Sequence, residues 1–392
     1  MSSSSVVVIG ASLAGLSAVR ALREQGHRGP ITVVGDELHP PYDRPPLSKE
    51  FLHDDIDISL GGEDDEADAD TTWLLGRRAI EISTDFGGHV VILEDGTRLA
   101  AESVVIATGA RARTLPSAHA LDGIHTLRTV DDARALRTSL RSARSLVVVG
   151  AGFIGAEVAS SAAAHGLSVT VIEISSAPLE SILGPHIGSL CAGLHAANGV
   201  RLLTGVAVDR FVGDKRVGAV QLTDGTVVPA DVVVVGIGAV PNTEWANGSQ
   251  LHIDNGFVTD PLCRTSVPGI YAIGDCARSY DESAGSHHRS EHWTNATAQA
   301  RIAAAAIVGA THKAAGAPYF WSRQYGRMLQ FAGRCSPTDE VRFVEGDPST
   351  ATFTAVYERA GEPVAVFAID SPRVFTRYRK QIERRPVAAP LT

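Results

Sequence analysis

Apolar residues in this chain gather in short unbroken runs, separated by glycine-rich turns and helix-like stretches. Val6 to Ile9 and Leu146 to Val149 are two such runs, about 140 residues apart. A continuous run of β-branched residues is typical of a parallel strand that is covered on both faces. Strand-like and helix-like stretches alternate from Val6 to about Val240. The pattern therefore predicts an α/β fold with parallel sheets.

The second half of this region repeats the plan of the first. In each half a glycine turn, a helix-like stretch and a second strand are followed by a hairpin, with an Asp-Gly pair at residues 95–96 and again at 224–225. Each half then closes with an apolar strand that ends in glycine, at Thr108 and Gly109 in the first and at Gly236 and Gly238 in the second. An internal repeat of this length indicates two similar domains.

The two glycine turns have the spacing of a dinucleotide-binding fingerprint. The second turn carries the complete set, Gly150, Gly152 and Gly155, and the first carries Gly10, Ser12 and Gly15. The first glycine permits a tight bend, the second lets the backbone approach a pyrophosphate, and the third lets the helix pack closely on the strand. The helix N-terminus then offers free N–H groups to the phosphates. Tight turns without a ligand are the alternative, but the pair predicts two nucleotide sites.

An acidic residue follows the second strand of each repeat. Glu173 lies 23 residues after Gly150, near the spacing of about 20 expected for the acid that binds a nucleotide ribose. A carboxylate there favours the free 2′-hydroxyl of NADH and repels the 2′-phosphate of NADPH, and residues 174–176 include no arginine. We therefore predict NADH in the second domain. In the first domain the candidates are Asp36 and Glu37.

Composition and charge argue against several other classes of protein, namely nucleic-acid-binding, membrane and secreted proteins. A chain of 392 residues has room for two or three domains, and a formal charge of −9 argues against a nucleic-acid partner. No apolar run reaches the ~18–20 residues of a membrane span, and the serine-rich start lacks the features of a signal peptide, so we expect a cytoplasmic protein. The segment 54–70 holds nine acidic residues and predicts a solvated loop.

The four cysteines form no closely spaced pair. Their spacing argues against disulfide reduction, and against a zinc ion or an iron–sulfur cluster in this chain. We expect buried, inert thiols. His287 and His288 lie on a Ser/Gly-rich stretch and are expected to be solvated, so no metal site is predicted.

The character of the chain changes near Pro318. Aromatic residues cluster there, and alternating strand-like stretches follow, which predicts a smaller α+β domain. Its end is basic, with Arg373, Arg377, Arg379, Lys380, Arg384 and Arg385. This stretch is either an ordinary solvated helix face or a positive surface that attracts an acidic partner.

Five segments of the chain carry a resemblance to a known family. They are PYDRPPLSKEFL (41–52), the Gly150 turn with Glu157, YAIGDCA (271–277), EHWTNA (291–296) and YFWSRQYG (319–326). The chain resembles the NADH-dependent ferredoxin reductases that serve aromatic-ring dioxygenases and haem-thiolate monooxygenases, within the glutathione-reductase-like flavoproteins. The likeness covers nearly the whole chain. One departure is Arg323, where the family usually has an acid, so partner contacts there are expected to differ.

The resemblance implies two Rossmann-like domains and a C-terminal interface domain. FAD would occupy a discontinuous domain, residues 1–112 and 238–317, and NADH the domain 113–237, with the interface domain at 318–392. The implied function is an NADH:ferredoxin oxidoreductase, in which hydride passes from NADH to FAD and single electrons then pass to a separate two-iron ferredoxin. The alternatives are an NADH flavoprotein with another acceptor and a signalling flavoprotein that resembles apoptosis-inducing factor.

The resemblance also implies roles for individual residues. Those expected at FAD are Gly10, Ser12, Gly15, Asp36, Glu37, Arg44, Lys49, Thr108, Gly109, Asp275 and Trp293. Those expected at NADH are Gly150, Gly152, Phe153, Ile154, Gly155, Glu157, Glu173, Gly236 and Gly238. Lys49 and Glu157 are expected to form an ion pair beside the flavin and the nicotinamide, where they would orient the reacting atoms.

For several of these residues a structural role is the alternative. Lys49 would then be a surface lysine, Glu157 an ordinary helix residue and Asp275 a helix N-cap. Trp293 and Trp321 are expected at the flavin edge, with ordinary core packing as the alternative.

Overall fold

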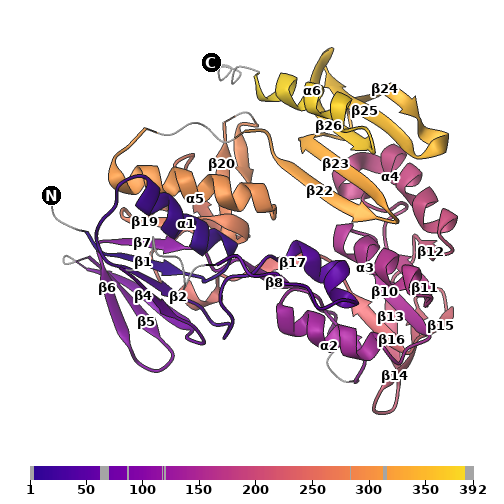
Figure 1. The fold of residues 1–392 in the computed structure, drawn as a ribbon, viewed down its shortest axis with the longest axis horizontal. Helices are drawn as coiled ribbons and strands as arrows, with labels where there is room; N and C mark the ends of the chain where they lie inside the picture. Colours follow the sequence, from indigo (N-terminus) through magenta and orange to yellow (C-terminus); the bar gives the residue numbers. More distant parts are fainter. Residues whose placement is uncertain are drawn as a thin grey trace.

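The structure is a computed structural model that describes residues 4–61, 70–85, 88–116, 118, 121–282, 284–311 and 316–384. Its first sheet is parallel, and its strands lie in the order β19-β7-β1-β2-β3 (Figure 1). Their bounds are Ile270–Ala272, Ser103–Ile106, Val6–Ile9, Ile31–Val34 and Thr71–Leu74. All four residues of β1 are buried, which explains their unbroken apolar run.

Two helices cover one face of this first sheet and an antiparallel sheet covers the other. The helices α1 (Leu13–Glu24) and α5 (Trp293–Val308) pack side by side in one apolar core. The opposite core is closed by β4 (Ala79–Asp85), β5 (Gly88–Leu93) and β6 (Arg98–Ala101). The result is a three-layer nucleotide-binding fold.

The second fold repeats this plan. Its parallel sheet has the order β12-β11-β10-β16-β9, with bounds Arg201–Thr204, Ser168–Glu173, Ser145–Val149, Val232–Val235 and Ile124–His125. The helices are α2 (Val130–Leu140), α3 (Phe153–Ala164) and α4 (Glu180–Ala197), which is kinked at Gly184. The antiparallel layer is formed by β13 (Val208–Gly213), β14 (Val217–Leu222) and β15 (Val227–Pro229).

Two strands connect the folds. β8 (Ala110–Ala112) leads out of the first fold, and β17 (Ala239–Pro241) leads back and pairs with it in the antiparallel sense. The returning chain forms a small sheet of β18 (Phe257–Thr259), β20 (Ala277–Asp281) and β21 (Ser286–His288), and it adds β19 to the first sheet. Because of this crossing, the glycine turn of each fold lies near the junction between the two folds. The domain boundaries given above stay a prediction.

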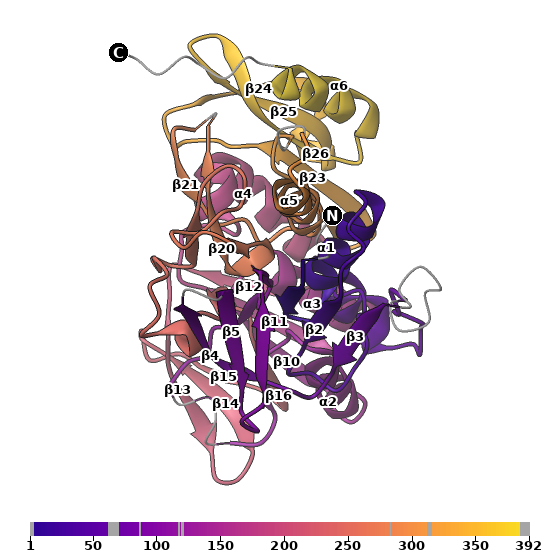
Figure 2. The same cartoon turned by 90° about the vertical axis from the view of Figure 1, so that its left-hand side faces the viewer.

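The C-terminal part is an antiparallel sheet with one helix. Its strands lie in the order β22-β23-β26-β25-β24, with bounds Tyr319–Gln324, Arg327–Gly333, Glu362–Ile369, Thr352–Arg359 and Glu340–Asp347. Large apolar residues on one face of this sheet pack against α4, and α6 (Pro372–Glu383) covers the other face (Figures 1 and 2). Phe375 of α6 is buried between this helix and the sheet. Figure 2 shows this sheet and α6 at the top of the molecule. The predicted fold class is therefore confirmed.

The four cysteines are free thiols. Cys191, Cys263 and Cys276 are buried as expected, whereas Cys335 is partly exposed. Burial raises the pKa of Cys191 to about 12 and that of Cys335 to about 11, which makes both poor nucleophiles at neutral pH.

Two other sequence-based expectations concern the surface. Within the described residues, no helix combines the length and hydrophobicity needed to cross a membrane. Most of the predicted acidic loop, residues 62–69, lies outside the described residues.

Candidate active site

One cavity of about 1150 Å³ runs between the two nucleotide-binding folds and reaches the C-terminal sheet. It lies at the carboxyl ends of β1 and β7 of the first fold and of β16 of the second, where parallel α/β sheets bind their ligands. Most of the residues expected at the cofactors line it. The four that do not are Gly15, Gly150, Gly155 and Glu173. The volume exceeds the ~300–1,000 Å³ of an ordinary small-molecule pocket.

Packing explains why three of these glycines lie outside the cavity lining. A Cβ on Gly15 would lie 1.9 Å from the oxygen of Gly10, and one on Gly155 would lie 2.1 Å from the oxygen of Gly150. Gly150 has a φ of +103°, and its added Cβ would lie 2.3 Å from the oxygen of Gly236. These glycines are therefore required by the close approach of helix, turn and strand.

Gly152 differs from the other glycines of its turn. A Cβ built on it would meet no protein atom within 4 Å, although Gly152 lines the cavity at the start of α3. The protein itself therefore does not require a glycine there, and the open space fits a ligand that approaches the backbone. In the first turn Ser12 occupies the same place, and its Oγ accepts a hydrogen bond of 2.8 Å from Arg44.

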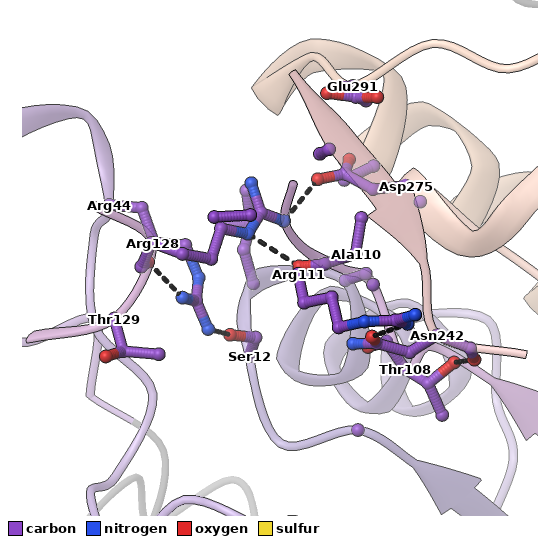
Figure 3. A pocket seen from close by; sticks show the side chains of 18 of the residues that line it. Ser12, Arg44, Thr108, Ala110, Arg111, Arg128, Thr129, Asn242, Asp275 and Glu291 are labelled. Atoms are coloured by element: carbon purple, nitrogen blue, oxygen red, sulfur yellow. Dashed lines mark hydrogen bonds and ion pairs between the residues drawn. The ribbon is translucent and has the colours of Figure 1, made fainter. Parts of the chain in front are cut away.

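Arg44 ties three parts of the first cofactor region together (Figure 3). Its guanidinium donates to Ser12 and to the carbonyl oxygen of Arg128, the latter at 2.5 Å. It also donates to Glu37 Oε1 at 2.6 Å. Tyr42 donates to the other Glu37 oxygen at 2.5 Å, and burial raises the pKa of the Tyr42 hydroxyl. Asp36 is more exposed, and one of its oxygens lies 3.9 Å from Arg78. Both acids line the cavity.

The structure adds Arg128, which the sequence reasoning missed. Its guanidinium donates to Asp275 Oδ2 at 2.6 Å and to the oxygen of Ala110 at 2.8 Å (Figure 3). The only sequence signal is its place before Thr129, which forms a capping box with Asp132 at the start of α2. Asp275 lies in the short 3₁₀ turn η6 (Gly274–Cys276), not at the start of α5, so it does not cap that helix.

Two further cavity residues carry buried polar atoms without a partner. Among the described residues, the buried side-chain nitrogens with no hydrogen bond are Trp245 Nε1, Arg289 Nε and His27 Nε2. Trp245 and Arg289 line the cavity. Buried donors are nearly always paired in native proteins, so these two nitrogens are exceptions among the residues of the cavity.

Lys49 and Glu157 meet at the cavity, as predicted. Lys49 Nζ lies 2.6 Å from Glu157 Oε2, and their side chains are 14% and 3% exposed. Lys49 therefore is not a free surface lysine, and Glu157 is a buried, paired carboxylate. Ser48 and Ser322 were missed, and each donates a hydrogen bond to this carboxylate, at 2.5 and 2.6 Å. Ser322 lies on the inward face of β22, where buried residues alternate with residues that are partly or fully exposed.

Aromatic residues close the side of the cavity that faces the C-terminal sheet. Trp293 is 38% exposed and donates its indole N–H to Asp43 at 3.0 Å, so it is not a core residue. Trp321 lines the cavity and stacks on Tyr319, with 5.8 Å between the ring centroids. His292 packs on Phe320, and burial lowers its pKa to about 4, which keeps the ring neutral at pH 7.

Glu173 ends β11 and supports the second glycine turn from outside the cavity lining. Its Oε2 accepts the backbone N–H of Ala151 at 2.7 Å, and its Oε1 accepts that of Ser175 at 2.8 Å. The carboxylate is thus fixed by two backbone donors beside the turn that starts α3. The next residue, Ile174, is 72% exposed.

Comparison with known proteins gives the family. Residues 4–300 match the pyridine nucleotide-disulphide oxidoreductase family, and residues 319–391 match the reductase C-terminal family. Rhodocoxin reductase of Rhodococcus erythropolis is 39% identical over 96% of this chain and 88% of its own. The chlorobenzene dioxygenase ferredoxin reductase component of Cupriavidus sp. (strain PS12) is 37% identical over 98% of this chain and 94% of its own.

A solved structure agrees with these relatives. The covalent putidaredoxin reductase–putidaredoxin complex matches with a TM-score of 0.93 and 34% identity, over 99% of this chain and 94% of the matched chain. The chain therefore belongs to the pyridine nucleotide-disulphide oxidoreductase family and, within it, to the ferredoxin reductases of oxygenase systems.

Proposed function

We propose that this protein is an NADH:ferredoxin oxidoreductase that holds FAD in its first fold and NADH in its second, and that reduces a separate two-iron ferredoxin. When bound, the two cofactors supply the redox chemistry, in which a hydride passes from nicotinamide to flavin and electrons leave singly. The observation that carries the proposal is the Lys49–Glu157 pair. It joins the two folds at the cavity that they share.

Cations and carboxylates suited to FAD surround the first glycine turn, and one of them, Arg128, comes from the segment before α2 of the second fold. Arg44 and Arg128 face the cavity beside the first glycine turn, where guanidinium groups pair well with phosphate oxygens. Asp36 or Glu37 accepts hydrogen bonds from the ribose hydroxyls. Asp275, held by Arg128, serves the ribityl chain. The remaining proposed contacts are Gly10, Ser12, Gly15, Thr108, Gly109 and Trp293.

The second fold offers an open turn and an acid suited to NADH. The space beside Gly152 and the N-terminus of α3 suit the pyrophosphate, because the helix presents free N–H groups there. Glu173 selects the free 2′-hydroxyl. Glu157 orients the nicotinamide against Lys49 and the flavin edge. The other proposed contacts are Gly150, Phe153, Ile154, Gly155, Gly236 and Gly238.

The C-terminal sheet and α6 are the proposed docking face for the ferredoxin. Trp321 lines the cavity, Tyr319 stacks on it, and the guanidinium of Arg379 from α6 lies 4.2 Å from the Tyr319 ring centroid. Only the side chains of Tyr319 and Trp321 therefore separate Arg379 of α6 from the cavity, which is a short path for an electron. Arg385, the last of the basic residues, lies outside the described residues.

We assign residues 1–112 and 238–317 to the FAD domain, 113–237 to the NADH domain and 318–392 to the interface domain. The path of the chain supports this division, since it leaves the first sheet after β7 and returns to it at β19. We further propose that the protein works in the cytoplasm, where thiols stay reduced, and its four free cysteines support this.

Anaerobic titration tests the function. The purified protein, reconstituted with FAD, should be yellow, should be bleached by NADH faster than by NADPH, and should then reduce an added two-iron ferredoxin, followed by its visible spectrum. A protein that takes up no FAD, or one that NADH does not bleach, contradicts the proposal. Bleaching without electron delivery to any ferredoxin would instead favour a flavoprotein that resembles apoptosis-inducing factor.

A further inference from the structure

The inward face of β22 is unusually polar for a buried strand. Phe320, Ser322 and Gln324 point inward, and the exposed fractions of Ser322 and Gln324 are 0% and 1%. Burial of a hydroxyl and an amide costs free energy unless each is hydrogen-bonded. Two such residues on one face of a strand therefore need specific hydrogen-bond partners. One of these partners belongs to the C-terminal sheet and the other does not.

The hydrogen bonds of these two residues run in one direction, toward Glu157. Gln324 Nε2 donates to Ser322 Oγ at 3.1 Å, and Ser322 Oγ donates to Glu157 Oε1 at 2.6 Å. Because a carboxylate only accepts, the Ser322 proton has to point at Glu157, and Gln324 supports that orientation from behind. A hydrogen bond to an ionised acceptor is stronger than one between two neutral groups.

The two oxygens of Glu157 are held by different parts of the molecule. Oε2 accepts from Lys49 and Ser48 of the first fold, whereas Oε1 accepts from Ser322 of the C-terminal sheet. Glu157 itself belongs to α3 of the second fold. All three parts of the chain therefore meet at one carboxylate, which is fixed at both ends against rotation about its last bond.

The turn that follows β22 is attached to the same helix. The backbone N–H of Tyr325 donates to Ser160 Oγ at 2.6 Å, and the Tyr325 hydroxyl shares a hydrogen bond of 2.7 Å with His195 Nδ1 of α4. Tyr325 has a φ of +53°, a conformation that costs free energy for a residue other than glycine. Its contacts with α3 and α4 hold β22 in register with Glu157.

We propose that Ser322, oriented by Gln324, is a positioning residue for hydride transfer: it sets the direction of the Glu157 carboxylate and, through it, of the Lys49 ammonium group. The C-terminal part of the reductase thereby shapes the reaction site as well as the docking face. This inference rests on the proposed function, because it assigns Ser322 a place in the NADH half-reaction.

The test compares Ser322→Ala with Ser322→Thr, which keeps the hydroxyl, and with Thr354→Val. Thr354 is a matched control because its hydroxyl is also fully buried in the C-terminal sheet but donates to Ser371 and not to Glu157. In stopped-flow reduction by NADH, Ser322→Ala should lower the limiting rate about tenfold with a smaller change in the dissociation constant, an effect of a size that one misplaced contact produces. Ser322→Thr should recover most of the rate, and Thr354→Val should match the wild type.

A second readout needs neither cofactor nor turnover. Without nucleotide, Ser322→Ala should lower the thermal unfolding midpoint of the protein, but it should cause little further loss in a Glu157→Ala background, because the two effects share one bond. Additive losses, or a wild-type reduction rate in Ser322→Ala, would overturn the inference. A wild-type protein that NADH fails to reduce would refute the proposed function instead, and the thermal comparison would still test the Ser322–Glu157 contact.

Discussion

Lys49 Nζ and Glu157 Oε2 lie 2.6 Å apart, although 108 positions separate the two residues in the sequence. Lys49 follows the 3₁₀ turn η1 (Pro45–Ser48) of the first fold, and Glu157 lies in the first turns of α3 in the second. Both side chains are largely buried. A buried ion pair is retained only with good geometry and added hydrogen bonds, which Ser48 and Ser322 provide here.

Removal of either member of this pair should slow the NADH half-reaction. We expect Lys49→Ala and Glu157→Ala each to lower the limiting rate of flavin reduction by about 10–100-fold, a typical effect of losing one electrostatic or positioning contact. Each single change also leaves a buried charge unpaired, at a cost of about 3 kcal/mol in unfolding free energy. Stopped-flow absorbance and thermal melts measure the two effects, with exposed Lys215→Ala as the control. Wild-type reduction rates in both variants would remove the pair from the mechanism.

Two glycines of the second turn allow the effect of a substitution on NADH binding to be distinguished from its effect on folding stability. Gly152→Ala should fold normally, because its Cβ meets no protein atom within 4 Å, but it should weaken NADH binding by about tenfold, or about 1.4 kcal/mol. Gly155→Ala places its Cβ 2.1 Å from the oxygen of Gly150 and should lower the unfolding midpoint instead. Calorimetric titration and thermal melts distinguish the two. Equal effects of the two substitutions on stability would contradict this division of roles.

Glu173 should decide between the two nicotinamide cofactors. We expect Glu173→Ala to reduce the preference for NADH over NADPH by about tenfold or more, because the loss of the carboxylate removes both the proposed bond to the ribose and the repulsion of the 2′-phosphate. The ratio of kcat/KM values for the two cofactors measures the preference. Glu180→Ala, a partly exposed acid at the start of α4, is the control. An unchanged ratio in Glu173→Ala would show that another residue selects the cofactor.

Salt should affect delivery to ferredoxin but not reduction by NADH. Arg373, Arg377 and Lys380 are exposed on α6, and Arg384 is exposed directly after its end. If this face attracts an acidic ferredoxin, kcat/KM for the ferredoxin should fall steeply between about 0.01 M and about 1 M salt, as the screening length drops from about 30 to about 3 Å. NADH–ferricyanide activity should stay constant.

Charge-reversal variants test whether the salt dependence of ferredoxin turnover comes from the basic residues of α6. Arg373→Glu combined with Arg377→Glu should reduce both ferredoxin turnover and its salt dependence, while Arg210→Glu on β13, an exposed arginine of the second fold, should change neither. Turnover in the α6 double variant that matched the wild type would place the docking face elsewhere.

Stability should fall on mild acidification, in part through His195. Burial lowers the pKa of His195 to about 4, from 6.5 in the unfolded chain. The unfolded chain therefore binds a proton below about pH 6.5 that the folded protein does not bind until about pH 4. The stability that depends on the neutral ring is present above pH 6.5 and is lost as the pH falls toward 4, by an amount on the order of 3 kcal/mol.

Thermal melts at pH 7 and pH 5 measure this loss. His195→Gln should show a smaller fall in unfolding midpoint than the wild type, while the exposed His186→Gln should behave like the wild type. His53 and His292 have their pKa lowered to about 4 by burial as well, so part of the fall should persist in His195→Gln. An identical fall in His195→Gln and the wild type would show that His195 does not contribute.

The sequence by itself determined the two nucleotide folds, because their signals are local. Four consecutive apolar residues, a turn of fixed glycine spacing and an acid near the end of the next strand are all read within about 30 residues of chain. Gly155 illustrates this: the clash that requires a glycine involves Gly150, only five residues away. The Lys49–Glu157 pair was also predicted, but from resemblance and not from any pattern in the residues.

Only the tertiary structure decided which polar side chains meet at the junction of the three parts. Arg128 reaches Asp275 across 147 positions, and Ser322 reaches Glu157 across 165. Neither a lone arginine before a helix nor a lone serine on a strand has a sequence signature, because its partner is chosen by how separate folds pack and not by local propensity. Buried hydrogen bonds between distant segments form only once apolar cores have fixed those segments in place, so their pairing is a property of the packed molecule.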